Sequence, residues 1–297
     1  MGGKKGIVHA VQNIDFSMQP GETFGLVGES GCGKSTTGRS ILRLTEPTRG
    51  NVIFDGVDLS SLNIKELRTY RKQMQMIFQD PFASLNPRMM VGETIAEPIY
   101  VHGLAKGKEV TDRVEKLLDR VGLTPDYAVR YPHELSGGQR QRIGIARALA
   151  LEPKLIIADE AVSALDVSIQ AQVVNLMMEL QEDLGLSYLF ISHDMAVIER
   201  VSHRVGVMYL GEIVELGLRS QIFENPQHPY TKKLMSAVPV ADPRKRKTEL
   251  NLMTDEIPSL VKPVDYEPEK IHLTKVDEGH YVICLLYTSD AADDLLC

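Results

Sequence analysis

The chain has 297 residues, of which 43% are hydrophobic and 25% charged, which is ordinary for a globular protein that buries a sizeable core. Its formal net charge is −7, so the bulk charge gives no reason to expect nucleic acid as a partner. Three cysteines, at positions 32, 284 and 297, show neither a disulfide pattern nor a metal-binding spacing. No stretch approaches the roughly 18 apolar residues that span a bilayer, so a role at a membrane would require other chains to hold the protein there.

The first third of the chain alternates strand and helix signals. Residues 23–27 are a short apolar run that ends at a glycine, which is typical of a buried strand. Residues 35–44 predict a helix, residues 52–54 a second strand, and residues 74–78 a third strand that runs up to Gln79. A glycine-rich loop therefore connects the first strand to the first helix.

Between about residues 92 and 150 the pattern becomes helical. Apolar residues recur at helical spacing in two segments, and Gly122 follows the first segment as a C-cap. The two sets are Val110, Val114, Leu117, Leu118 and Val121, and then Ile143, Ala146 and Leu149. We interpret residues 92–149 as a helical insert in a larger domain.

Strand signals return after residue 150. Residues 155–158 are continuously apolar, as expected of a central parallel strand, and residues 169–184 form an amphipathic helix. Residues 187–191 are the next strand, and residues 205–216 predict a hairpin that turns at Gly211. Strands that alternate with helices predict an α/β fold with a mostly parallel sheet, and the hairpin predicts an antiparallel β portion.

The composition changes again near residue 225, where prolines and charged residues become frequent. We expect the segment from 225 to 284 to be an extended tail that packs on the domain in places. Residues 285–297 fit nothing before them and resemble translated sequencing-adapter read-through, so we interpret them as a non-native tail.

Residues 28–35 fit the phosphate-loop pattern G-x-x-x-x-G-K-[ST], and they lie after a predicted strand and before a predicted helix, where that loop must lie. Glycines let backbone N–H groups close around phosphate oxygens, and the helix N-terminus adds a favourable dipole. Lys34 would neutralise the β- and γ-phosphates, and Ser35 would offer its hydroxyl to Mg²⁺. A plain glycine-rich turn is the alternative, but the position of residues 28–35 between a strand and a helix favours ATP binding. The expected contacts are Gly28, Glu29, Ser30, Gly31, Cys32, Gly33, Lys34, Ser35 and Thr36.

Two acidic residues follow the strand at 155–158. A carboxylate at the C-terminal end of a buried strand lies beside the crevice where ligands bind in such sheets. Asp159 would hold Mg²⁺, directly or through water, and Glu160 would orient or deprotonate the attacking water. A strand that ends in solvated acids is a common alternative, but a phosphate loop in the same chain favours the catalytic interpretation.

Residues 135–142 read LSGGQRQR, a Ser-Gly-Gly turn that opens a helix and can direct N–H groups at phosphate. A simple N-cap by Ser136 is compatible with this segment, but it does not explain the glycine pair. The segment resembles the signature sequence of the ABC ATPases, whose loop meets the γ-phosphate held by the other subunit. The resemblance implies nucleotide contacts by Ser136, Gly137, Gly138 and Gln139.

Further segments resemble the ABC ATPases in the same order along the chain. Gln79 resembles the Q-loop glutamine, residues 163–166 resemble the D-loop that crosses the dimer interface, and His193 resembles the switch histidine. A lone histidine is more often structural, and only the position of His193 after the last core strand favours the functional role. The resemblance implies catalytic roles for Glu160, His193 and Gln79, nucleotide binding by Asp166, and Mg²⁺ contacts by Ser35, Gln79 and Asp159.

The resemblance narrows to the oligopeptide and dipeptide importer ATPases over about residues 7 to 283. The segments that carry it are 27–39, 78–87, 162–172 and 225–234. It implies a P-loop NTPase fold of the RecA-like type with the helical subdomain of ABC proteins inserted. The implied regions are an ATP-binding core at 1–91 and 150–224, a helical signature subdomain at 92–149, and an importer-type C-terminal extension at 225–284.

The resemblance also implies a function. The chain would be the ATP-hydrolysing subunit of an importer, peripheral on the cytoplasmic face of the membrane. Its partners would be a homologous second ATPase in a head-to-tail dimer, two transmembrane permeases and, indirectly, an external solute-binding protein, with no nucleic acid. We expect oligopeptides or dipeptides as cargo, with nickel and glutathione as alternatives because the ATPase does not touch the cargo. A non-transport ABC ATPase is a further alternative, which the single cassette and the acidic charge disfavour.

Two expectations concern details of the nucleotide site. Cys32 lies near a helix N-terminus, which should lower its thiol pKa and favour alkylation that ATP suppresses, unless it only fills a tight turn. Members of the family stack the adenine on an upstream aromatic ring, but Phe16 is the first aromatic residue and His9 is the only ring before it. We therefore expect that Met1 is an internal start or a fragment edge. ATP would bind about 5- to 150-fold more weakly, with little preference over GTP.

Overall fold

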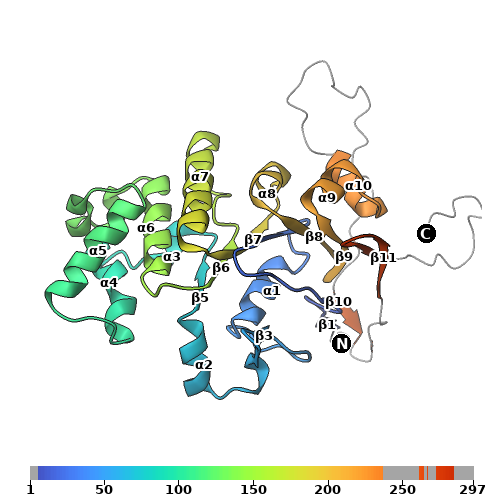
Figure 1. Cartoon of the computed structure of the whole chain (residues 1–297), viewed down its shortest axis with the longest axis horizontal. Coiled ribbons are helices and arrows are strands. Elements are labelled where there is room, and N and C mark those ends of the chain that lie inside the picture. The colour runs from blue at the N-terminus through green and yellow to red at the C-terminus, as the bar shows by residue number, and fades with distance from the viewer. Residues whose placement is uncertain (1–5, 237–260, 264–265, 267–271, 284–297) are drawn as a thin grey trace, which may run out of the picture. The chain divides into compact units, whose positions relative to one another are not determined.

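The computed structural model describes residues 6–236, 261–263, 266 and 272–283 (Figure 1). The chain divides into two compact units. Unit 1 comprises residues 1–17, 24–37 and 193–297, and unit 2 comprises residues 18–23 and 38–192. The predicted read-through tail at 285–297 lies outside the described residues.

Unit 1 contains a strand series that is parallel at one end and antiparallel at the other. Strand β2 (Thr23–Val27), almost all of which belongs to this unit, pairs in parallel with β8 (Arg204–Tyr209). Strand β8 then pairs antiparallel with β9 (Glu212–Leu218), followed by β12 (His280–Ile283) and β11 (Leu273–Asp277). The predicted strand at 23–27 and the predicted hairpin at 205–216 are confirmed, and Gly211 turns the hairpin with φ of +89°.

The described parts of the region after residue 225 pack on unit 1, as expected in places from the sequence, but the prediction of an extended chain is wrong at α10. Helix α10 (Pro229–Ser236) follows α9 (Arg219–Glu224), and the β11–β12 hairpin joins the strand series of unit 1. The physical reason is burial, because Tyr230 and Thr231 of α10 are buried despite the surrounding prolines and charges. Strands β1 (Gly6–Val8) and β10 (Val261–Pro263) form a separate antiparallel pair, and α8 (Met195–Val201) completes the helices described here for unit 1.

Unit 2 is built on three parallel strands. Strand β6 (Leu155–Asp159) lies between β5 (Met74–Ile77) and β7 (Ser187–Ser192), and every residue of β6 is buried. Helix α7 (Val167–Leu184) connects β6 to β7 and ends at Gly185 in the left-handed conformation. These elements confirm the predicted strands and helix. A short hairpin, β3 (Ile53–Phe54) with β4 (Val57–Asp58), precedes α2 (Ile64–Arg71).

Helices fill the stretch between β5 and β6, as the sequence predicted. In Figure 1, α4 (Val91–Val101), α5 (Lys108–Arg120) and α6 (Gly137–Leu149) gather at one end of unit 2, after the short α3 (Pro81–Ser84). Helix α5 buries Val110, Val114 and Leu118, the apolar stripe expected from the sequence. The predicted division into an ATP-binding core, a helical subdomain at 92–149 and a C-terminal extension at 225–284 stays a prediction. Among the described residues, no helix has the length and apolar character needed to cross a membrane.

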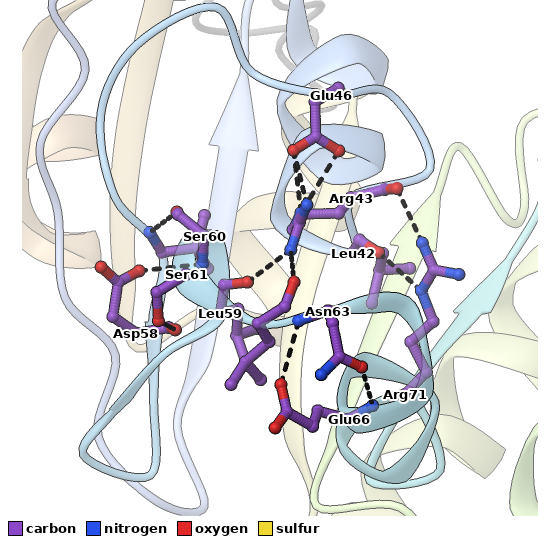
Figure 2. Close-up of polar contacts among 12 residues, drawn as sticks. Leu42, Arg43, Glu46, Asp58, Leu59, Ser60, Ser61, Asn63, Glu66 and Arg71 are labelled. Carbon is purple, nitrogen blue, oxygen red and sulfur yellow. Dashed lines mark hydrogen bonds and ion pairs between the residues drawn. The ribbon is translucent and has the colours of Figure 1, made fainter.

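Two arginines fasten the end of the first helix, α1 (Lys34–Ile41), inside unit 2 (Figure 2). Arg71 of α2 donates to the carbonyl oxygens of Leu42 (2.9 Å) and Arg43 (2.7 Å), which lie just beyond the last helical residue. Arg43 itself has a φ of +50°, pairs with Glu46 and donates to the carbonyl oxygen of Leu59 at 2.7 Å. Carbonyl groups at a helix end have no partner within the helix, so Arg71 satisfies two carbonyls at the end of α1. Arg43 ties the same chain segment to the carbonyl of Leu59.

Candidate functional site

The phosphate-loop candidate, residues 28–35, connects β2 to α1 in unit 1. Gly31 and Gly33 have φ values of +84° and +108°, and Gly28 has +152°. A Cβ atom would lie 2.0 Å from the Ala10 carbonyl oxygen at Gly33, and 2.1 Å from the Met208 carbonyl oxygen at Gly28. Any side chain at these two positions would collide with backbone, so the loop follows a path that requires glycine.

Lys34 is the first residue of α1 and is only 4% exposed. Its Nζ atom donates to the carbonyl oxygens of Gly28 and Glu29, at 2.8 Å each. The N–H of Thr37 makes the first bond of the helix ladder, to Gly33 at 2.9 Å, so the preceding N–H groups have no partner within the helix. A buried cation beside a helix N-terminus creates a positive field that fits a bound phosphate.

Cys32 is buried inside this loop, with 6% of its surface exposed. Burial raises the pKa of its thiol, and the nearby Lys34 offsets this effect only in part. The prediction of a lowered thiol pKa is therefore wrong, because the sequence showed the helix N-terminus but not the burial. The side chain acts as a small filler in a tight turn, the alternative that the sequence left open.

The two acids at the end of β6 lie in unit 2 and are both buried. Glu160 has a φ of +48°, a conformation uncommon outside glycine, and its N–H donates to the Ile191 carbonyl oxygen at 2.9 Å. Its Oε2 atom accepts a hydrogen bond from the Gln79 side-chain amide at 2.8 Å. The structure thus brings together Gln79, which follows β5, and Glu160, which follows β6. Backbone strain of this kind is concentrated at functional sites.

The signature-like segment starts helix α6 in unit 2. Ser136 Oγ accepts from the Gln139 N–H at 3.3 Å, and Gln139 Oε1 accepts from the Ser136 N–H at 2.9 Å, which is a complete capping box. A Cβ atom on Gly138 would lie 2.4 Å from Ile169 Cγ2, and one on Gly137 would lie 3.4 Å from Leu165. Close packing against the segment around α7 therefore accounts for part of the glycine pair.

The remaining predicted residues lie at element ends. Asp166 precedes α7 as its N-cap residue but makes no side-chain capping bond, and Ser163 Oγ donates to the Glu160 carbonyl oxygen at 2.9 Å. His193 is exposed and follows β7, and Asp194 caps α8 through the N–H groups of the second and third helical residues. His193 and the phosphate loop belong to unit 1, whereas Gln79, the acids and the signature segment belong to unit 2.

Comparisons with known proteins decide the family. A family model described as ABC transporter matches residues 11–163, which is more than half of the chain. The chain belongs to the ABC transporter family. A second model, described as the C-terminal region of oligopeptide/dipeptide transporters, matches residues 214–265.

Among curated ABC relatives, the glutathione import ATP-binding protein GsiA of Pectobacterium atrosepticum is 59% identical over 275 residues. The protein of the same name from Salmonella paratyphi A is 60% identical over 275 residues. Both alignments cover 93% of this chain and 44% of the relative. The chain therefore spans about half the length of the curated relatives that it matches.

Two solved ABC structures show the fold. CbiO1 from Clostridium perfringens, described as part of the ABC transporter complex cbiONQ, has a TM-score of 0.66 at 27% identity, covering 73% of this chain and 84% of that one. The ATP-binding cassette MJ0796, solved as a dimer in a post-hydrolysis state with ADP and Pi, has a TM-score of 0.65 at 31% identity, covering 71% and 90%. The predicted fold, that of a P-loop NTPase with a mixed sheet and helices, is confirmed.

The rings of His9 and Phe16, which precede the phosphate-loop candidate, each pack on another ring of unit 1. Phe16 stacks on Phe24 with 4.7 Å between ring centroids, so it packs on a core residue. The His9 ring lies edge-on to Tyr266, with centroids 5.1 Å apart. Tyr266 comes from the C-terminal region, and the sequence alone gave no signal for this pair because the two residues are far apart along the chain.

Proposed function

We propose that this chain is the ATP-binding and ATP-hydrolysing cassette of an importer. The observation that carries the proposal is the loop at 28–35, where buried Lys34 lies at a helix N-terminus and two glycines exclude any side chain. The backbone N–H groups of the loop and of residues 34–36 would hold the phosphates. Lys34 would neutralise their charge, and Ser35 would offer its hydroxyl to Mg²⁺.

The acids and Gln79 would serve the chemical step. Bound Mg-ATP supplies the phosphoanhydride bond, and Asp159 and Gln79 would contact the metal. Glu160 would orient the attacking water and accept its proton. The Gln79 amide, which donates to Glu160 Oε2 at 2.8 Å, would fix the direction of that carboxylate. His193 would donate to the terminal phosphate, and Asp166 would lie at the contact with a second cassette.

A second cassette completes the proposed assembly. The self-capped helix start at Ser136–Gln139 would meet the nucleotide held by the other subunit, as the family resemblance implies, in a head-to-tail pair. The dimeric state of the related cassette MJ0796 supports this arrangement. Two transmembrane permeases and an external solute-binding protein would complete the importer, with this chain peripheral on the cytoplasmic face of the membrane.

We propose a short peptide of the glutathione class as the cargo. The C-terminal match to oligopeptide/dipeptide transporters supports a peptide, and the relatives at 59–60% identity are named for glutathione import. These names favour the glutathione alternative over oligopeptides in general. A solute-binding protein encoded beside this gene should bind glutathione more tightly than dipeptides or Ni²⁺ in calorimetry. Preference for either of the others would overturn the proposed cargo.

Hydrolysis is tested by the variant Glu160→Gln. The protein should release phosphate from ATP only with Mg²⁺ present, and the variant should bind Mg-ATP normally but turn over about 10²- to 10⁴-fold more slowly. Glu179→Gln, which changes an exposed carboxylate on α7, is the matched control and should behave like the parent. Turnover by Glu160→Gln within a few-fold of the parent would rule out the catalytic role.

A further inference from the structure

A buried polar cluster in unit 1 starts at Glu215 of β9, whose side chain is completely buried. Its Oε1 atom accepts from the Gln227 N–H at 2.8 Å and lies 2.8 Å from His280 Nε2. Its Oε2 atom accepts from the His228 N–H at 2.9 Å. A buried carboxylate is costly unless it is satisfied in this way. Glu215 therefore fixes the backbone that leads into α10.

His228 extends the cluster to the start of α10. Its Nδ1 atom accepts a hydrogen bond from the N–H of Tyr230 at 3.1 Å, so this nitrogen carries no proton. Burial lowers the pKa of His228, which keeps the ring neutral and available as an acceptor, although Glu215 acts in the opposite direction. The first turn of α10 is thus held by side chains, and Tyr230 is 8% exposed.

Tyr230 contacts the phosphate loop directly. Its hydroxyl oxygen accepts a hydrogen bond from the N–H of Glu29 at 3.0 Å, and its ring packs on Tyr209 with centroids 4.3 Å apart. The N–H of Glu29 and the carbonyl of Gly28 belong to one planar peptide unit. The Gly28 carbonyl oxygen accepts from Lys34 Nζ at 2.8 Å. One peptide plane is therefore held by Tyr230 on one side and by the phosphate-binding lysine on the other.

We propose that Tyr230 is a positioning residue of the phosphate loop, through which the C-terminal region sets the orientation of the Gly28–Glu29 peptide and hence the position of Lys34. The inference rests on the proposed function, since it assigns Tyr230 to the nucleotide site. Without the hydroxyl, the Glu29 N–H loses its acceptor in a partly buried loop, and the peptide plane is free to rotate. The loop would then spend part of its time in conformations that do not bind phosphate.

The variant Tyr230→Phe removes the hydroxyl and keeps the ring packing. Mg-ATP and Mg-GTP should both bind about 3- to 10-fold more weakly, by the same factor, because the loss of one hydrogen bond acts on the loop and not on the base. Amide hydrogen exchange at Glu29 should become faster in the nucleotide-free protein. Tyr209→Phe removes a hydroxyl from the other ring of the pair and should leave both measurements at the parent values.

Unchanged nucleotide affinity in Tyr230→Phe, or unchanged exchange at Glu29, would overturn the proposal. A loss confined to ATP would also overturn it, because the hydroxyl would then act at the base. The circular dichroism spectra of Tyr230→Phe and Tyr209→Phe should match that of the parent, which would show that both variants are folded. Lys34→Ala, measured alongside, separates the two claims: if it binds nucleotide like the parent, the proposed function fails, whereas its loss of binding leaves only Tyr230 in question.

Discussion

Two glycine-rich helix starts in this chain differ in how their N–H groups are used. At α1 the side chain of buried Lys34 bonds to carbonyl oxygens of its own loop, and glycines precede the helix. At α6 the capping box between Ser136 and Gln139 satisfies the helix start from within the same segment.

The difference separates two ways of meeting a phosphate. The start of α1 combines a buried cation with N–H groups that have no partner in the helix, so it fits an anion without help from another chain. The start of α6 is already capped, and a phosphate there would compete with Ser136 for the Gln139 N–H. We therefore propose nucleotide binding within a single chain for the start of α1, and a role in a second cassette's site for the start of α6.

The largest effect is expected from alanine at a glycine of the first helix start. Gly33→Ala puts a methyl group 2.0 Å from the Ala10 carbonyl oxygen at a φ of +108°, so Mg-ATP should bind at least about 100-fold more weakly. Gly138→Ala meets only the Ile169 side chain and should cost about 1–3 kcal/mol of unfolding free energy without changing ATP affinity. Calorimetry measures the Mg-ATP affinity of the two variants, and urea unfolding measures their free energy of unfolding. Gly33→Ala with near-parent affinity would contradict the comparison.

A smaller effect is expected from the cap of α6. Ser136→Ala removes the acceptor of the Gln139 N–H, and because that bond is long and exposed, the loss should be about 0.5–1 kcal/mol in urea unfolding. Ser168→Ala, at an exposed position near the start of α7, is the matched control. Equal stability of the two variants would show that the capping box contributes nothing.

The smallest effect concerns Cys32. Because burial raises the pKa of its thiol, little thiolate exists at neutral pH, and alkylation should speed up only as the pH rises above the usual thiol range. Iodoacetamide labelling over a pH series, followed by mass spectrometry of the peptide that contains Cys32, measures this. Rapid labelling at pH 7 would restore the original prediction of a lowered pKa.

The sequence predicted the elements whose signals are local. The strand at 23–27, the hairpin around Gly211 and the helix that ends at Gly185 all follow from apolar spacing and glycine position. The glycine-rich loop between β2 and α1 was predictable for the same reason, because its glycines and Lys34 are adjacent in the chain.

What the sequence could not predict depends on distant partners or on burial. The hydrogen bond from the Glu29 N–H to the Tyr230 hydroxyl joins residues 201 positions apart, and no local sequence pattern in either segment predicts it. The pKa of Cys32 was predicted in the wrong direction because the sequence shows neighbours in the chain but not burial. Helix α10 was missed because the prolines around it masked a short helix held by tertiary contacts.

The most direct test of the central claim is equilibrium binding of Mg-ATP to three forms of the isolated chain: the parent, Lys34→Ala and Ser136→Arg. The account predicts that Ser136→Arg binds within about 3-fold of the parent, because its own phosphate loop is intact. Lys34→Ala should lose at least about 100-fold in affinity, because it removes the buried cation that we propose bonds to phosphate. Loss of binding in Ser136→Arg, or parent-like binding in Lys34→Ala, would contradict the assignment of the two helix starts.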